Sequence, residues 1–209
     1  MSRIVLAIVA TLVPQLAHAE EYEAEMRATV VAGAARVAED VDTPAEVVPA
    51  AGLAGMLGYG LRDSLTIEGE LAITALTTAR YPDALVRFDG GENRGPTERI
   101  TRTARLSGGA TLRLGVAWIP TVHAGLGIQA RWRTAAVFLP RADQVPNGMD
   151  TDVSLDLTAT IRVGLDRRIN RRWMVGASVG VTHAVPLGAP AFDLFDVHLS
   201  ASYVWYPLW

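Results

Sequence analysis

Hydrophobic and polar residues alternate along most of the chain with a period of two. The clearest stretch is DVSLDLTATIRVGLD, residues 152–166, in which every odd position from 153 to 165 is apolar. The opposite face carries mainly polar side chains. This alternation is typical of a β-strand, whose successive side chains point to opposite faces. At about 3.3 Å per residue, the stretch is long enough to cross a bilayer at a tilt.

The same alternation recurs along the chain, and no apolar stripe follows a helical period. We count about eight such segments, beginning near residues 21, 51, 64, 101, 121, 151, 172 and 194. Their connections differ in length. Residues 62–64, 119–121 and 167–171 form short turns, whereas residues 39–50, 81–99, 137–150 and 186–193 form long loops that contain Pro, Gly or Asp. Short turns on one side and long loops on the other are typical of outer-membrane barrels.

Alternation alone leaves two orientations open. A lipocalin-like barrel turns its apolar face inward, whereas a membrane barrel has a polar lumen and an apolar exterior. The apolar face here has no charged residue in the middle of the strands, and the tryptophans gather toward strand ends, as in membrane aromatic girdles. We therefore predict an all-β fold: a single transmembrane antiparallel up-and-down β-barrel of about eight strands.

In this orientation the charged side chains line the lumen, where acids and arginines would neutralise one another. The predicted lumen charge network consists of Glu23, Glu25, Arg27, Glu68, Glu70, Arg113, Arg131, Asp152, Asp156 and Arg162. The formal net charge of −3 and the lack of a dense basic patch argue against a nucleic-acid partner. Cysteine is absent, so no disulfide constrains the fold.

The N-terminus has the features of an export signal. Arg3 precedes an apolar run, Ile4 to Val13, and the small residues Ala17-His18-Ala19 follow. The run is too short to span a bilayer as a helix, and it lacks the periodic polar face of a buried amphipathic helix. We expect residues 1–19 to be a cleaved signal peptide and residues 20–209 to form the barrel domain, exported to the cell outer membrane.

Two segments resemble the small eight-stranded outer-membrane barrels of the OmpA and OmpX type. One is GYGLRDSLTIEGEL, residues 58–71, which is similar to a hairpin of that family. The other is the C-terminal YVWYPLW, residues 203–209. The resemblance implies that the last strand carries a signal for the barrel assembly machinery, with Tyr203, Trp205 and Trp209 facing lipid as part of an aromatic girdle. The proline at 207 departs from the family pattern.

Eight strands enclose a lumen just wide enough to be filled by side chains. We therefore expect a non-enzymatic protein with a structural role in the envelope or a surface-interaction role, and residues 87–99 as the main contact surface or as a solvated linker. One alternative is a narrow charge-selective porin. Another is a lipid A-modifying enzyme, because His198 and Ser200 match a His-x-Ser spacing. Their register places both in the lumen, away from lipid.

The sequence contains no pattern that calls for a cofactor. His123 and His183 stand alone and are expected to be hydrogen-bonded lumen or rim residues. No His, Asp and Glu spacing indicates a metal site, and DGGEN in the loop lacks the ligand spacing of a calcium site. The expected partners are the outer-membrane bilayer, the assembly machinery and unidentified surface contacts.

Overall fold

The computed structural model describes residues 23–37, 45–62, 64–88, 91–138, 146–186 and 192–206. All its regular elements are strands. They are β1 (Ala24–Val37), β2 (Glu46–Arg62), β3 (Leu65–Leu76), β4 (Ala79–Phe88), β5 (Gly91–Arg113), β6 (Trp118–Phe138), β7 (Pro146–Arg168), β8 (Trp173–Pro186) and β9 (Phe192–Trp205). No helix among these residues is long and apolar enough to cross a bilayer.

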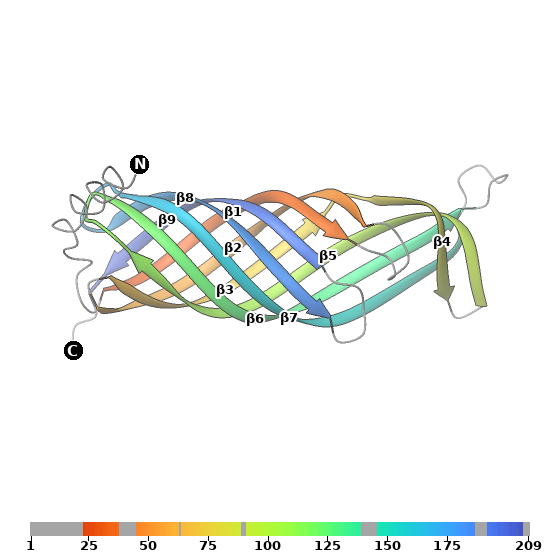
Figure 1. The fold of residues 1–209 in the computed structure, drawn as a ribbon, viewed down its shortest axis with the longest axis horizontal. Helices are drawn as coiled ribbons and strands as arrows, with labels where there is room; N and C mark the ends of the chain where they lie inside the picture. The colour runs from red at the N-terminus through yellow and green to blue at the C-terminus, as the bar shows by residue number, and fades with distance from the viewer. Residues whose placement is uncertain are drawn as a thin grey trace, which may run out of the picture.

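The strands form one antiparallel sheet that closes on itself (Figure 1). The strand order is β3-β2-β1-β9-β8-β7-β6-β5-β4, and the additional pairing of β3 with β5 completes the ring. β4 continues the path of β3 after a break at Thr77 and Thr78, so the closed ring has eight members. First and last strands pair along their whole length, from Ala24 opposite Trp205 to Val37 opposite Phe192. The predicted fold class is confirmed.

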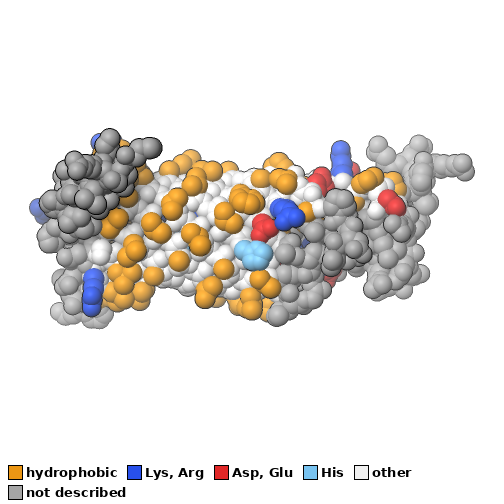
Figure 2. All heavy atoms as spheres, viewed as in Figure 1, with side chains coloured by type: hydrophobic (Ala, Val, Ile, Leu, Met, Phe, Trp, Pro, Cys, Tyr) orange, Lys and Arg blue, Asp and Glu red, His pale blue; other side chains and the backbone are white. Residues whose placement is uncertain are grey.

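The two faces of the sheet differ in chemistry as the alternation predicted. Leu, Ile and Val side chains dominate the exterior, with Leu53 65% exposed and Leu126 72% exposed. Figure 2 shows them spread over the middle of the barrel, with charged side chains near its two ends. The interior holds the buried Thr, Glu, Asp and Arg side chains. A belt of this kind suits hydrocarbon, because unpaired charges are costly there.

The short connections lie at the end of the barrel where β1 begins and β9 ends (Figure 1). The prediction of a turn at residues 119–121 is wrong, because these residues already belong to β6. The turn comprises Leu114 to Ala117 instead. Gly115 has a φ of 111°, a conformation that side chains with a Cβ rarely adopt and that the tight reversal requires.

The loop-side end departs most from the sequence-based prediction. Residues 81–99 were expected to form a loop, yet most of them form the β-hairpin of β4 and the first part of β5. β5, β6 and β7 have 23, 21 and 23 residues, whereas β3 has 12 and β8 has 14. They extend beyond the other strands as a sheet (Figure 1). The sequence missed this extension because Gly and Pro residues interrupt its alternation.

Several predictions fall outside the described residues. They include the signal peptide at residues 1–19, the start of the mature chain at residue 20, and the place of Trp209.

A charge on the apolar belt should destabilise the folded barrel if that belt faces hydrocarbon. We expect Leu126→Arg to lower the free energy of unfolding in lipid vesicles by about 2–4 kcal/mol, because residue 126 lies near the middle of the β6 exterior. Ile169→Arg, in the exposed β7–β8 turn, is the control and should cost roughly 0–1 kcal/mol. Urea-induced unfolding measures both, and equal effects would contradict the lipid-facing orientation.

Candidate functional site

The lumen near the short turns contains a chain of ion pairs that joins three strands. Arg27 on β1 donates from Nε to Glu25 Oε1 at 2.9 Å and from Nη2 to Asp166 Oδ2 at 2.6 Å on β7. Arg113, the last residue of β5, pairs with the second oxygen of Glu25. Because each group has an oppositely charged neighbour, the chain links β1, β5 and β7 across the lumen.

A second cluster occupies the middle of the lumen around Glu70. Arg105 donates to Glu70 Oε1 at 2.8 Å, and Arg162 approaches Glu70 Oε2 at 2.6 Å. Arg105 also donates to Thr182 Oγ1 at 2.6 Å. The carboxylate on β3 is thus shared by guanidinium groups from β5 and β7, and the contact with Thr182 adds β8.

Two histidines complete the middle of the lumen. His123 Nδ1 faces the Glu68 carboxylate, which also accepts a hydrogen bond from Thr111 at 2.8 Å. His198 Nε2 lies 3.1 Å from Asp196 Oδ1. Between Arg27, Glu68 and these histidines a polar cavity of about 20 Å³ remains, room for roughly one water molecule.

At the loop-side mouth Arg131 is completely buried and holds Asp156 with both Nε and Nη2, at 3.1 and 3.2 Å. Its guanidinium lies 5.6 Å from the ring centroid of Phe192, which reaches into the lumen from β9. Asp152, predicted as a lumen residue, lies at the mouth instead. Its side chain is 49% exposed and pairs with Arg133.

Apolar clusters lie at both ends of the lumen. At the turn side Ile119, Met174 and Val204 are buried against one another. At the loop side a larger cluster comes from the inner faces of six strands: Ala35, Val37, Val48, Ala50, Leu76, Ala79, Tyr81, Ala184, Phe192 and Leu194. The charged middle is therefore flanked by apolar side chains, which disfavour the passage of ions.

The structure brings most predicted lumen residues into ion pairs. Glu23, just before β1, pairs with Arg168 at 2.9 Å. Burial raises the pKa of the Glu23 carboxyl, and the nearby Arg168 guanidinium opposes that rise. The prediction missed five inward-facing partners, Arg105, Arg133, Asp166, Arg168 and Asp196. Four of them, Arg105, Arg133, Asp166 and Asp196, lie at inward-facing positions of strands that the alternation had already identified. Arg168 lies in a stretch that was predicted to be a turn.

Glycines on the inner face provide space for these charges. A Cβ at Gly176 would meet the Asp166 carboxylate, and one at Gly180 would meet the stem of Arg162 and, at 2.9 Å, Asp196 Oδ1. A Cβ at Gly109 would lie 2.6 Å from Cε1 of His123. These positions therefore require glycine for close packing.

An aromatic group lies on the exterior near the short turns. The rings of Tyr203 and Trp205 stack at 6.1 Å, and Trp173 meets Tyr203 edge to face at 5.3 Å. Trp118 lies on the same outer surface, where Arg167 stacks on it at 4.9 Å. Their position at the edge of the apolar belt matches that of an interfacial girdle.

The third histidine of the described residues, His183, is on the outside. His183 Nδ1 lies 2.6 Å from Asp193 Oδ1, and Arg36 approaches the other oxygen of Asp193 at 3.7 Å. Within the described part of the chain, no three His, Asp or Glu side chains come together in a way that could hold a metal ion.

Comparison with solved structures identifies the fold. Ail, the attachment invasion locus protein of Yersinia pestis, superposes with a TM-score of 0.56 at 12% identity, covering 88% of this chain and 99% of Ail. Neisserial surface protein A superposes with a TM-score of 0.53 at 10% identity, covering 87% and 95%. No family model and no curated protein sequence matches the chain.

The fold and the surface lead to the same conclusion. The chain has the eight-stranded antiparallel architecture of these outer-membrane barrels. Its exterior is apolar, its interior is charged, and its backbone polar groups are paired around a closed ring, which is what a bilayer demands. The protein is an outer-membrane β-barrel with buried salt bridges in its interior.

Removing the carboxylate at Glu70 should leave two buried guanidinium groups without their shared partner. We expect Glu70→Ala to lower the free energy of unfolding by roughly 3–5 kcal/mol. Glu98→Ala breaks a matched but exposed pair with Arg80 and should cost less than about 1 kcal/mol. Urea-induced unfolding in vesicles compares the two variants, and equal costs would show that the lumen pairs add nothing to stability.

A methyl group at an inner-face glycine should displace the lumen charges. Gly176→Ala would push Asp166 away from Arg27 and is expected to cost about 1–3 kcal/mol of stability. Gly55→Ala is the control, because its added Cβ has no heavy atom within 4 Å. Urea-induced unfolding in vesicles measures the free energy of unfolding of both variants. A larger loss for the Gly55 variant would contradict the packing described here.

Proposed function

We propose that this barrel is a non-enzymatic protein that presents the β4–β7 sheet extension at the cell surface for contact with other molecules. The observation that supports this is the extension itself, most of which lies outside the closed ring. β4 pairs with β5 alone, and Pro146–Leu155 of β7 lies beyond the pairing with β8. Two sheet edges are thus without a strand partner among the described residues, and such edges are ready templates for association.

The root of the extension is connected to β2 and β5 by polar contacts, which favours a defined contact surface. The backbone N–H of Arg80 donates to Glu46 Oε2 on β2 at 2.8 Å, and Arg80 pairs with Glu98 on β5 at 2.9 Å. Exposed loops positioned on a rigid scaffold are common binding surfaces. Ail, which has the same fold, is named for attachment and invasion.

Excision of the hairpin tests this role. Replacing residues 78–99 with an Asn-Gly turn should keep the ring, because β3 pairs with Arg102–Leu112 of β5. Folding is checked by the different gel migration of boiled and unboiled samples. Nanodiscs that carry the complete chain should bind members of a panel of surface glycans and matrix proteins, and nanodiscs with the excised chain should not. Equal binding by both would reject the proposal.

The porin alternative requires a continuous aqueous path. The apolar clusters at both ends and the cavity of only about 20 Å³ count against it. We expect no reproducible step conductance from the refolded protein in planar bilayers. Regular conductance steps that persist in the Arg131→Gln variant with altered ion selectivity would instead support a charge-selective pore.

The enzyme alternative requires that His198 and Ser200 meet a lipid. His198 is 3% exposed and lies inside the barrel, and Ser200 donates to the backbone oxygen of Gly176 at 3.4 Å. Ser200 borders the outer surface, but the imidazole of His198 is enclosed in the lumen beside Asp196, so an acyl ester outside the barrel does not meet the two side chains together. Incubation with lipid A should therefore release no acyl chain, from the wild type or from His198→Ala.

A further inference from the structure

The turn between β7 and β8 presents arginines to the outside. Arg167, Arg171 and Arg172 are exposed, and none forms an ion pair with a carboxylate among the described residues. Arg168, which lies between them in sequence, points inward and pairs with Glu23 at 2.9 Å. Arg168 is thus neutralised by a carboxylate of the same chain, whereas the three outward arginines can bind an external anion.

Hydrogen bonds fix the backbone of this turn. Asn170 Oδ1 accepts hydrogen bonds from the backbone N–H groups of Arg172 and Trp173, at 2.8 and 3.0 Å. The backbone oxygen of Arg172 accepts from Val204 N–H at 2.8 Å, which ties the turn to β9. Arg167 is held by its contact with the Trp118 ring at 4.9 Å. An anion would therefore meet a turn whose backbone is already fixed, with Arg167 held beside Trp118.

Their depth in the membrane indicates which anion is available. Trp118 and Trp173 are 56% and 48% exposed and lie at the turn-side edge of the apolar belt. Tryptophan at such an edge lies at the level of lipid headgroups. Short turns face the periplasm in outer-membrane barrels, so the adjacent headgroups are those of the inner leaflet. Guanidinium groups bind phosphate with two parallel hydrogen bonds.

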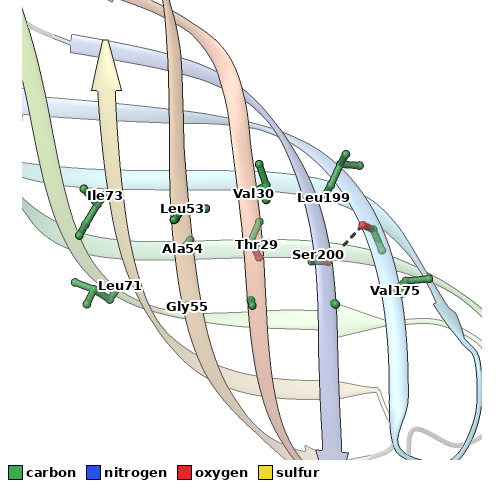
Figure 3. Close-up of a pocket in the computed structure, with 13 residues that line it drawn as sticks. Thr29, Val30, Leu53, Ala54, Gly55, Leu71, Ile73, Val175, Leu199 and Ser200 are labelled. Atoms are coloured by element: carbon green, nitrogen blue, oxygen red, sulfur yellow. Dashed lines mark hydrogen bonds between the residues drawn. The ribbon is translucent and has the colours of Figure 1, made fainter.

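An apolar groove begins next to Arg167 and leads into the hydrocarbon. The strand register continues from Arg167 to Val175, Ala201, Ala28 and Gly55, each opposite the next on neighbouring strands. Small side chains along this row leave a groove of about 830 Å³ (Figure 3). Figure 3 shows Leu53, Val30 and Leu199 as a row of larger side chains along one border.

The dimensions of the groove suit one acyl chain. From β7 to β2 the row crosses four strand spacings of about 4.8 Å, roughly 19 Å in all. One leaflet occupies about half of a hydrocarbon core of ~30 Å. Because the row moves away from the short turns as it passes from Arg167 near the end of β7 to Gly55 well inside β2, it runs obliquely through one leaflet.

We propose that this surface binds one anionic phospholipid of the inner leaflet. Arg167, Arg171 and Arg172 hold the phosphate, and an acyl chain lies along Val175, Ala201, Ala28 and Gly55. The site rests on the bilayer embedding described above, and it is independent of the proposed surface-contact role. Its chemistry selects phosphatidylglycerol over phosphatidylcholine, whose choline neutralises the phosphate.

Native mass spectrometry of the complete chain tests the site. The protein is folded in nanodiscs that contain equal amounts of phosphatidylglycerol and phosphatidylcholine, then released into a mild detergent, and retained lipid is counted. The wild type should retain phosphatidylglycerol about tenfold or more in excess. The triple variant R167Q/R171Q/R172Q should lose that excess. Arg102→Gln is the control. It removes an outward arginine of β5 near the loop side, and this variant should keep the excess of phosphatidylglycerol.

Substitution in the groove separates the acyl contact from the charge. Ala201→Leu should lower retention of phosphatidylglycerol with every arginine intact, whereas Ala159→Leu, on the exterior of β7 outside the groove, should not. Gel migration of unboiled samples confirms folding, and the single variant R167Q replaces any triple variant that fails to fold. An equal excess in wild type and arginine variants, or no excess in the folded wild type, would overturn the site. Excision of residues 78–99 should leave retention unchanged, so this result is read separately from surface binding.

Discussion

Closure of β1 against β9 is the constraint on which the rest of the structure depends. A bilayer offers no water to satisfy an open strand edge, so a membrane sheet must pair its first strand with its last. Here the pairing runs from Ala24 opposite Trp205 to Val37 opposite Phe192. Closure also fixes the parity of every strand, because a shift by one residue would turn all side chains of a strand to the opposite face. Glu25 and Arg27 are inside and Met26 is outside for this reason alone.

Once parity is fixed, the charges inside must balance locally. Moving a single guanidinium from water into a closed lumen is costly, and a carboxylate within hydrogen-bond distance offsets that cost. Glu70 on β3 pairs with Arg105 on the neighbouring β5 and with Arg162 on β7, two strands further round the ring. Asp156 on β7 pairs with Arg131 on the neighbouring β6. The glycines at 176 and 180 belong to the same arrangement, since a methyl group at either would occupy the space of a charged side chain.

The sequence predicted the ring well and the loop side poorly, for a physical reason. Alternation reports which face of a strand is apolar, so it identified the inward parity of Glu25, Glu70 and Arg162. It contains no information on which acid meets which arginine, because partners such as Asp166 and Arg27 are 139 residues apart and meet only through closure. Beyond the bilayer both faces of a strand meet water, and the alternation disappears. The hairpin of β4 and β5 was therefore taken for a loop.

The two ends of the barrel differ in how they use arginine. At the loop side Arg133 and Arg80 pair with Asp152 and Glu98, so the mouth and the root of the extension are held by internal pairs. At the turn side the exposed arginines of the β7–β8 turn have no such carboxylate among the described residues, and they stand beside an aromatic ring and a groove. Water screens exposed pairs and makes them weak, whereas a headgroup layer supplies phosphate at high local density. The unpaired cations therefore belong on the side of the barrel where lipid provides the counterion.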